Sequence, residues 1–264
     1  MVTNPEDLLA ILSHPRSAVA ESYRGIRTQL QRAMAGGVSS LMVVSAFAGD
    51  GKSMVCANVA VAMTQLFFNI ILVDGDLRRP TITKLFGMDG KPGLADYLLG
   101  QAPLESVIHE SPIDRLRIVP CGQVTENPAD LLGRPSLEAF CRKVQATSDF
   151  CVFDTSPLAA CSDALSFAPC AGSAAMVINP KRWNGEVEVR IRQSLEDQGV
   201  RVLGVLLNGV DALDTAYGYG GYGYGYGYGY GYGGDHGRDE GHSRDSVRPK
   251  SRLAKFLAHL RGKP

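Results

Sequence analysis

Residues 41–53 have the sequence LMVVSAFAGDGKS and carry the strongest structural signal in the chain. An apolar run ends in a glycine-bearing loop, which leads directly into a segment with helical spacing of apolar residues, SMVCANVAVAMTQL. This order predicts a phosphate-binding loop, whose backbone N–H groups and helix N-terminus face phosphate oxygens. Lys52 is expected to reach the terminal phosphates, and the Ser53 hydroxyl to bind Mg²⁺. The expected nucleotide contacts here are Gly49, Asp50, Gly51, Lys52, Ser53 and Met54.

The composition is that of an ordinary globular protein except near the C-terminus. Of 264 residues, 45% are hydrophobic, and 27 Lys and Arg balance 27 Asp and Glu. Residues 217–234 are only Tyr and Gly, and about 216 residues precede them, enough for one α/β domain. Residues 238–264 contain eight Lys or Arg against three Asp or Glu. This basic tail fits an acidic partner or an anionic lipid surface, and a plain solvated tail fits equally well.

The longest apolar runs, at residues 41–48 and 67–73, are far shorter than the roughly 18 residues of a membrane span. The N-terminal MVTNPEDLLAILSHPR lacks the basic and apolar regions of a secretory signal, so a cytoplasmic location is expected. The six cysteines form no C-x-x-C pair, and metal or disulfide roles are not expected. They are Cys56, Cys121, Cys141, Cys151, Cys161 and Cys170.

Six short apolar or β-branched runs alternate with segments of helical spacing, which predicts a mostly parallel sheet with helices on both faces. The expected strands are 41–46, 69–74, 115–120, 149–154, 173–179 and 201–208. In such sheets ligands bind at the carboxyl ends of the strands. An amphipathic helix over 17–34, with Tyr23, Ile26, Leu30 and Met34 on one face, precedes this core. The Gly-Tyr tract and the polar stretch over 233–250 cannot bury enough apolar surface to offset their ordering entropy, so disorder is expected there. Residues 251–264, SRLAKFLAHLRGKP, have the pattern of a short basic amphipathic helix.

Two further strand ends carry acids. Residues 71–80, ILVDGDLRRP, place Asp74 and Asp76 two residues apart, so both carboxylates point the same way if the extended geometry persists. A plain Asp-Gly turn is the alternative, but beside a phosphate loop such acids suit a metal site and a base. Residues 151–157, CVFDTSP, place Asp154 at a strand end, which fits an aspartate that binds Mg²⁺ directly or through water.

With these motifs the sequence resembles the cytoplasmic kinase domain of bacterial tyrosine kinases that govern capsule and exopolysaccharide synthesis, related to the deviant-Walker P-loop ATPases. The resemblance covers about residues 15 to 232. It rests on AFAGDGKS as Walker A, VDGDLRRP as Walker A′, FDTSP as Walker B, PGLADYLLG, NPADLL and the C-terminal tyrosine cluster. Ala46 stands where the phosphate loop usually has its first glycine. The other departures from the family pattern, Ala48, Asp50 and Ser156, each lie beside a key residue rather than replacing one.

The resemblance implies an ATP- and Mg²⁺-dependent protein-tyrosine autokinase with a P-loop NTPase-like fold. Lys52 and Ser53 would bind ATP and Mg²⁺, Asp74 and Asp154 would contribute to the metal site, and Asp76 would orient or deprotonate a tyrosine hydroxyl. At the last strand end, Asn-Gly-Val-Asp over 208–211 is similar to the guanine-reading motif N-K-x-D but lacks its lysine. The family places an adenine-contacting Asn near this position, so the resemblance implies that Asn208 contacts the adenine of ATP.

The family also joins subunits into a ring through E-x-x-R-x-x-R, present here as Glu21, Arg24 and Arg27. A solvated i,i+3 ion pair is the alternative. An 18-residue Gly-rich tract spans roughly 21 to 25 Å, so its tyrosines could reach a neighbouring subunit's site. Charge repulsion from their phosphates would favour ring dissociation. The expected acceptors are Tyr217, Tyr219, Tyr222, Tyr224, Tyr226, Tyr228, Tyr230 and Tyr232.

The expected organisation is an N-terminal segment and oligomerisation helix over 1–36, a kinase domain over 37–216, a tyrosine cluster over 217–234 and a basic polar tail over 235–264. The resemblance implies a separate transmembrane activator or polysaccharide co-polymerase, a tyrosine phosphatase, and attachment to the inner face of the cell membrane through a partner. No nucleic acid is expected. The rival hypotheses are a positioning or partitioning ATPase that binds membrane or DNA, and a nucleotide-gated scaffold with an adhesive tail.

Overall fold

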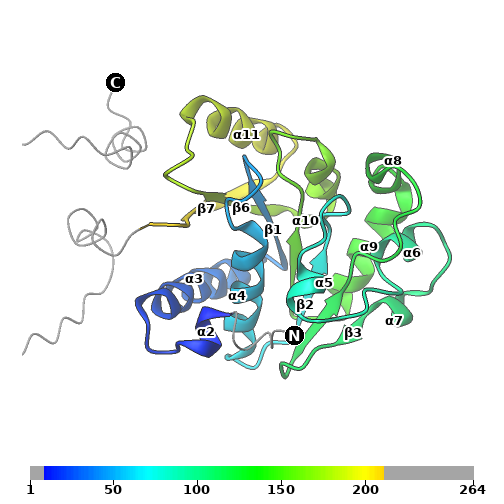
Figure 1. The fold of residues 1–264 in the computed structure, drawn as a ribbon, viewed down its shortest axis with the longest axis horizontal. Helices are drawn as coiled ribbons and strands as arrows, with labels where there is room; N and C mark the ends of the chain where they lie inside the picture. Colours follow the sequence, from blue (N-terminus) through cyan, green and yellow to red (C-terminus); the bar gives the residue numbers. More distant parts are fainter. Residues whose placement is uncertain (1–8, 211–264) are drawn as a thin grey trace, which may run out of the picture.

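A seven-stranded sheet organises the computed structural model, which describes residues 9–210 (Figure 1). The strand order is β3-β4-β2-β5-β1-β6-β7, and all neighbours are parallel except the antiparallel pair β3 and β4. The strands are β1 (Ser40–Ser45), β2 (Ile70–Asp74), β3 (His109–Glu110), β4 (Leu116–Val119), β5 (Phe150–Asp154), β6 (Ser173–Ile178) and β7 (Arg201–Leu207).

All six expected strands are confirmed to within two residues at each end. The short strand β3 was not predicted, because a two-residue strand has no measurable periodicity. The prediction of burial on both faces holds for β1, β2, β5 and β6 and is wrong for β7, where Val205 is 37% exposed. Among the described residues, β7 is an edge strand of the sheet, and its side chains are half-buried or exposed.

Helices cover both faces of the sheet (Figure 1). One face packs against α2 (Ala10–Ser13), α3 (Ala18–Ala35), α4 (Lys52–Thr64) and α5 (Ile82–Leu85). The other packs against α6 (Leu94–Leu98), α7 (Leu104–Val107), α8 (Pro128–Leu132), α9 (Pro135–Ala146), the 3₁₀ helix η1 (Asp163–Phe167), α10 (Ala168–Ala171) and α11 (Gly185–Asp197).

Strand β1 shows how the sequence builds two cores. Leu41 and Val43 enter the core beneath α3 and α4, whereas Met42 and Val44 enter the core on the opposite face. Successive strand side chains point to opposite faces, so an unbroken apolar run fits only a strand that is covered twice. The α/β fold class predicted from these runs is therefore confirmed.

The amphipathic helix predicted over 17–34 is α3. The Ser17 side chain caps it by accepting a hydrogen bond from the Ala20 N–H, and Tyr23 and Leu30 are buried. Residues 128–146 form two helices, α8 and α9, because α8 ends at its C-cap Gly133 and Pro135 starts a new helix.

The parallel topology brings the carboxyl ends of β1, β2 and β5 to one edge of the sheet, with β5 between the other two. Asp74 and Asp154 are register partners at the ends of β2 and β5. Within residues 9–210, no helix combines the length and apolarity needed to cross a membrane. The predicted tyrosine cluster and basic tail lie outside the described residues.

Candidate nucleotide site

The loop between β1 and α4 has the conformation that its glycines permit. Gly49 and Gly51 have φ angles of 86° and 89°, a left-handed conformation that side-chain-bearing residues rarely adopt. Gly51 is the N-cap of α4, so the first turn of the helix starts at Lys52. The loop is closed by its own acid, because Asp50 Oδ2 accepts a hydrogen bond of 2.9 Å from the Phe47 N–H. This is the geometry of an anion-binding loop at a helix N-terminus.

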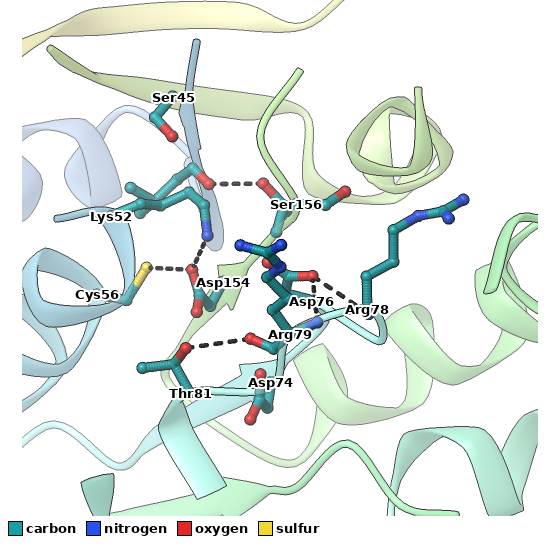
Figure 2. A network of polar contacts seen from close by, with 12 residues as sticks. Ser45, Lys52, Cys56, Asp74, Asp76, Arg78, Arg79, Thr81, Asp154 and Ser156 are labelled. Atoms are coloured by element: carbon teal, nitrogen blue, oxygen red, sulfur yellow. Dashed lines mark hydrogen bonds and ion pairs between the residues drawn. The ribbon is translucent and has the colours of Figure 1, made fainter. Parts of the chain in front are cut away.

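Lys52 is held by the acid at the end of β5. Its Nζ lies 2.5 Å from Asp154 Oδ1, and both side chains are buried (Figure 2). Burial lowers the pKa of Lys52, but the charge of Asp154 and the hydrogen bond between them outweigh it and leave the pKa raised. Lys52 therefore remains a cation, and it also lines the cavity described below.

Asp74 and Asp154 form a buried pair of acids below the loop. Asp74 Oδ2 accepts hydrogen bonds from the N–H and hydroxyl of Thr83 at 3.0 and 2.9 Å. Burial, with the charge of Asp154, raises the pKa of Asp74 to about 7. Cys56 on α4 directs its Sγ at Asp154 Oδ1 from 3.5 Å, and burial raises its thiol pKa well above the usual range. Asp74 Oδ1 and Asp154 Oδ2 are buried without a hydrogen-bond partner among the described residues.

Asp76 stands on the loop after β2, beside Arg78 and Arg79 (Figure 2), and lines the cavity described below. Its Oδ1 accepts hydrogen bonds from the backbone N–H groups of Arg78 and Arg79 at 3.3 and 3.1 Å. Burial raises the pKa of Asp76, although Lys52 and these N–H groups act in the opposite direction. Arg78 turns away and pairs with buried Asp163 at 2.6 Å, which ties the loop to η1.

A cavity of about 550 Å³ opens above these residues. Its size suits a small-molecule ligand. Asp76 lines it, whereas Asp74 and Asp154 lie deeper. The lining residues are Ser45, Phe47, Ala48, Gly49, Asp50, Gly51, Lys52, Ser53, Met54, Asp76, Arg78, Arg79, Thr81, Leu85, Ser156, Pro157, Ala160 and Cys161.

The chemistry of the donor set fits a divalent cation. Buried carboxylate oxygens without partners are costly unless a cation or donor joins them, and Asp74 Oδ1 and Asp154 Oδ2 are two such oxygens on neighbouring strands. Oxygen ligands of this kind are those that Mg²⁺ prefers, and Ser53 adds a hydroxyl at the start of α4.

The structure thus gathers Lys52, Ser53 and the three predicted aspartates at one sheet edge. Asn208 does not line the cavity. Its Nδ2 donates to the Asp50 carbonyl at 2.8 Å, and it lies so close to Gly51 that a Cβ there would be 1.9 Å from it. In this structure Asn208 supports the loop, and its predicted adenine contact stays a prediction.

The predicted oligomerisation residues make contacts within their own subunit. Arg24 Nη1 lies 2.9 Å from Glu21, as in a simple i,i+3 pair, and Nη2 donates to the Pro15 carbonyl. Arg27 Nη1 donates to Gln65 Oε1 at 3.1 Å near the end of α4. Their role in a ring stays a prediction. The predicted acceptors from Tyr217 to Tyr232 lie outside the described residues.

Sequence reasoning missed three residues that shape the site: Thr83, Asp163 and Arg182. Thr83 and Asp163 lie on short helices without a motif, and only the fold shows that they contact the acid-bearing loops. Arg182 follows β6 and donates to the Ala48 carbonyl. The rule that ligands bind at strand carboxyl ends points to its loop, but no residue pattern singles it out.

Curated relatives share most of this chain. A tyrosine-protein kinase of Bacillus subtilis, YwqD, is 31% identical over 212 residues, which cover 80% of this chain and 90% of YwqD. A putative tyrosine-protein kinase in the cps region of Klebsiella pneumoniae is 31% identical over 79% of this chain but only 29% of its own length. The chain therefore spans nearly all of one relative and less than a third of the other. No protein-family model matches the chain.

Solved structures show the same fold. The kinase domain of the Escherichia coli tyrosine kinase ETK has a TM-score of 0.74 and 30% identity, covering 83% of this chain and 84% of that domain. The septum site-determining protein MinD of Pyrococcus horikoshii, complexed with Mg-ADP, has a TM-score of 0.55 and 26% identity, covering 64% of this chain and 70% of MinD. Because its fold, its site residues and these similarities agree, the chain belongs to the bacterial tyrosine-protein kinase family.

Proposed function

We propose that this protein is an ATP- and Mg²⁺-dependent protein-tyrosine autokinase whose subunits phosphorylate one another's C-terminal tyrosines and thereby regulate polysaccharide polymerisation or export. The observation that carries the proposal is that Lys52 and Asp76 line one cavity next to a phosphate-binding loop, with Asp154 and Asp74 buried directly beneath it. Positioning and electrostatic stabilisation supply most of the catalysis in phosphoryl transfer, and these residues offer both.

Ser53, Asp154 and Asp74 would hold Mg²⁺, which neutralises negative charge on the phosphate oxygens. Lys52 would exchange its contact with Asp154 for the terminal phosphates, because Lys52 lines the cavity where the nucleotide would bind, whereas Asp154 lies beneath it. Loop N–H groups would orient the phosphates, and the glycine conformations at 49 and 51 support this role.

Asp76 would accept the proton of the incoming tyrosine hydroxyl. It lines the cavity, whereas Asp74 is fully buried and committed to Thr83. Burial raises the pKa of Asp76, and a more basic carboxylate is a better proton acceptor. Two backbone N–H groups fix Oδ1, so the carboxylate is already oriented before the acceptor arrives.

Transfer between subunits would use the Gly-Tyr tract, because the composition of this 18-residue tract predicts a span of roughly 21 to 25 Å, enough to reach a neighbour's cavity. The subunits would form a ring through Glu21, Arg24 and Arg27. The support is the triplet itself and membership of the family.

Regulation of polysaccharide synthesis is supported by the relative named for a cps region. A transmembrane activator and a phosphatase would act as partners, and the activator would hold the kinase at the inner face of the membrane. The much greater length of that relative is consistent with a kinase portion that works beside other protein segments.

A mixing experiment tests both activity and direction of transfer. The acceptor chains carry Lys52→Met and keep their tyrosines. The donor chains are wild type except that every tyrosine between residues 217 and 232 is replaced by Phe. The two kinds of chain are mixed in the presence of Mg·ATP. Phosphotyrosine mass spectrometry should find phosphate on the Lys52→Met chains only after mixing. Asp76→Asn serves as a second inactive acceptor. Acceptor chains that stay unmodified, while wild-type chains become phosphorylated, would show transfer within one subunit.

The likeness to MinD favours a second candidate, a positioning ATPase that binds a membrane or DNA. Co-sedimentation with anionic vesicles and gel shift with duplex DNA, each with and without Mg·ATP, distinguish the two. Phosphate release without phosphotyrosine, coupled to nucleotide-dependent vesicle or DNA binding, would support this candidate and refute the kinase.

A further inference from the structure

The loop between β6 and α11 reaches the outer side of the phosphate loop. Arg182 in this loop donates from Nη1 to the Ala48 carbonyl, and the same nitrogen lies 3.9 Å from Asp50 Oδ1. Its guanidinium also lies 6.0 Å from the centre of the Phe47 ring, within range of a cation–π contact. One side chain therefore joins three residues of the phosphate loop to the end of β6.

The φ of 86° at position 49 favours a glycine. A Cβ there would also lie 2.8 Å from Arg182 Nη1, so the end of the Arg182 side chain would have to move. Arg182 itself does not line the cavity, so any effect on a bound ligand passes through the loop.

Besides joining the phosphate loop to β6, the Arg182 guanidinium lies close to the carboxylate of Asp50. Asp50 is only 2% exposed, and its Oδ1 has no hydrogen-bond partner among residues 9–210. Glu188 on α11 is also buried, and burial together with the charge of Asp50 raises its pKa. A buried negative charge in the wall of a triphosphate site opposes anion binding, and the Arg182 guanidinium offsets it.

We propose that Arg182 is a positioning residue for ATP, which fixes the outer side of the phosphate loop and neutralises Asp50 so that loop N–H groups face the triphosphate. The inference rests on the proposed nucleotide site and adds a residue outside its motifs. The loss of a hydrogen bond, a cation–π contact and a charge pair should weaken nucleotide binding by about tenfold to a hundredfold.

Isothermal titration calorimetry with Mg²⁺ and adenylyl imidodiphosphate tests this on the full chain. Arg182→Met should raise the Kd by about tenfold to a hundredfold, and Arg182→Lys, which keeps only the charge, should fall between it and wild type. Adding Asp50→Asn to Arg182→Met should recover about threefold or more by removing the repulsion. Arg190→Met, on the exposed surface of α11, is the matched control and should bind as wild type does.

Kinetics separate positioning from general damage. Arg182→Met should raise the KM for ATP while kcat and the urea midpoint stay near wild-type values. Wild-type affinity in both Arg182 variants would overturn this inference and leave the proposed nucleotide site standing. A second outcome would do the same: a loss of affinity that accompanies a lowered urea midpoint in both variants and that Asp50→Asn does not relieve. Absence of binding by the wild-type chain would instead sink the proposed nucleotide site, and the role of Arg182 with it.

Discussion

Replacing Asp74 by Asn tests the electrostatics of the buried acid pair. Burial and the charge of Asp154 raise the pKa of Asp74 from 3.8 to about 7. Between these values the folded protein keeps a proton that the unfolded chain releases, so the free energy of unfolding falls as pH rises through this window. At 1.36 kcal/mol per pH unit, the fall that Asp74 contributes is about 4 kcal/mol.

The Asp74→Asn protein loses this titration but keeps the local contacts, because the amide oxygen can accept both hydrogen bonds from Thr83. At pH 4 the variant and wild type should be nearly equally stable. At pH 8 the variant should be more stable by about 2 to 4 kcal/mol.

Urea denaturation without Mg²⁺ or nucleotide, at steps from pH 4 to pH 8, measures the difference between the two proteins. Effects of other titrating groups largely cancel in that difference. Asp130→Asn, on the exposed surface of α8, controls for loss of a carboxylate as such. A stability difference between Asp74→Asn and wild type that does not change with pH would refute the assignment of a raised pKa to Asp74.

Four further outcomes are expected. Lys52→Met should lower the free energy of unfolding by about 3 to 5 kcal/mol at neutral pH, because it leaves Asp154 buried and unpaired, and added Asp154→Asn should restore part of the loss in urea titrations. Gly51→Ala should abolish nucleotide binding in calorimetry, because its Cβ would collide with Asn208; wild-type affinity would contradict the loop geometry. Removal of Mg²⁺ by EDTA should abolish phosphotyrosine on blots and added Mg²⁺ should restore it. Chains phosphorylated within residues 217–232 should elute from size exclusion as smaller species than dephosphorylated chains, and identical elution would exclude dissociation by charge repulsion.

Much of the fold could be predicted from local patterns. The apolar runs around Val43 and Leu72 are too evenly apolar for a one-sided sheet, so they indicate strands covered on both faces. The glycines at 49 and 51 predict the left-handed turns of the phosphate loop, because few other residues tolerate those φ angles. Apolar patterning and backbone conformational preferences each depend on only a few neighbouring residues, so they can be read from the sequence.

Contacts between distant segments needed the folded chain. The sequence suggested Asp74 and Asp76 for the same face, but packing makes one a buried acid tied to Thr83 and leaves the other in the cavity wall. The pairing of Lys52 with Asp154, 102 residues apart, and the reach of Arg182 to the Ala48 carbonyl depend on strand order. Strand order arises from the packing of whole helices and strands, so a residue's partners across the sheet leave no trace in its sequence neighbours.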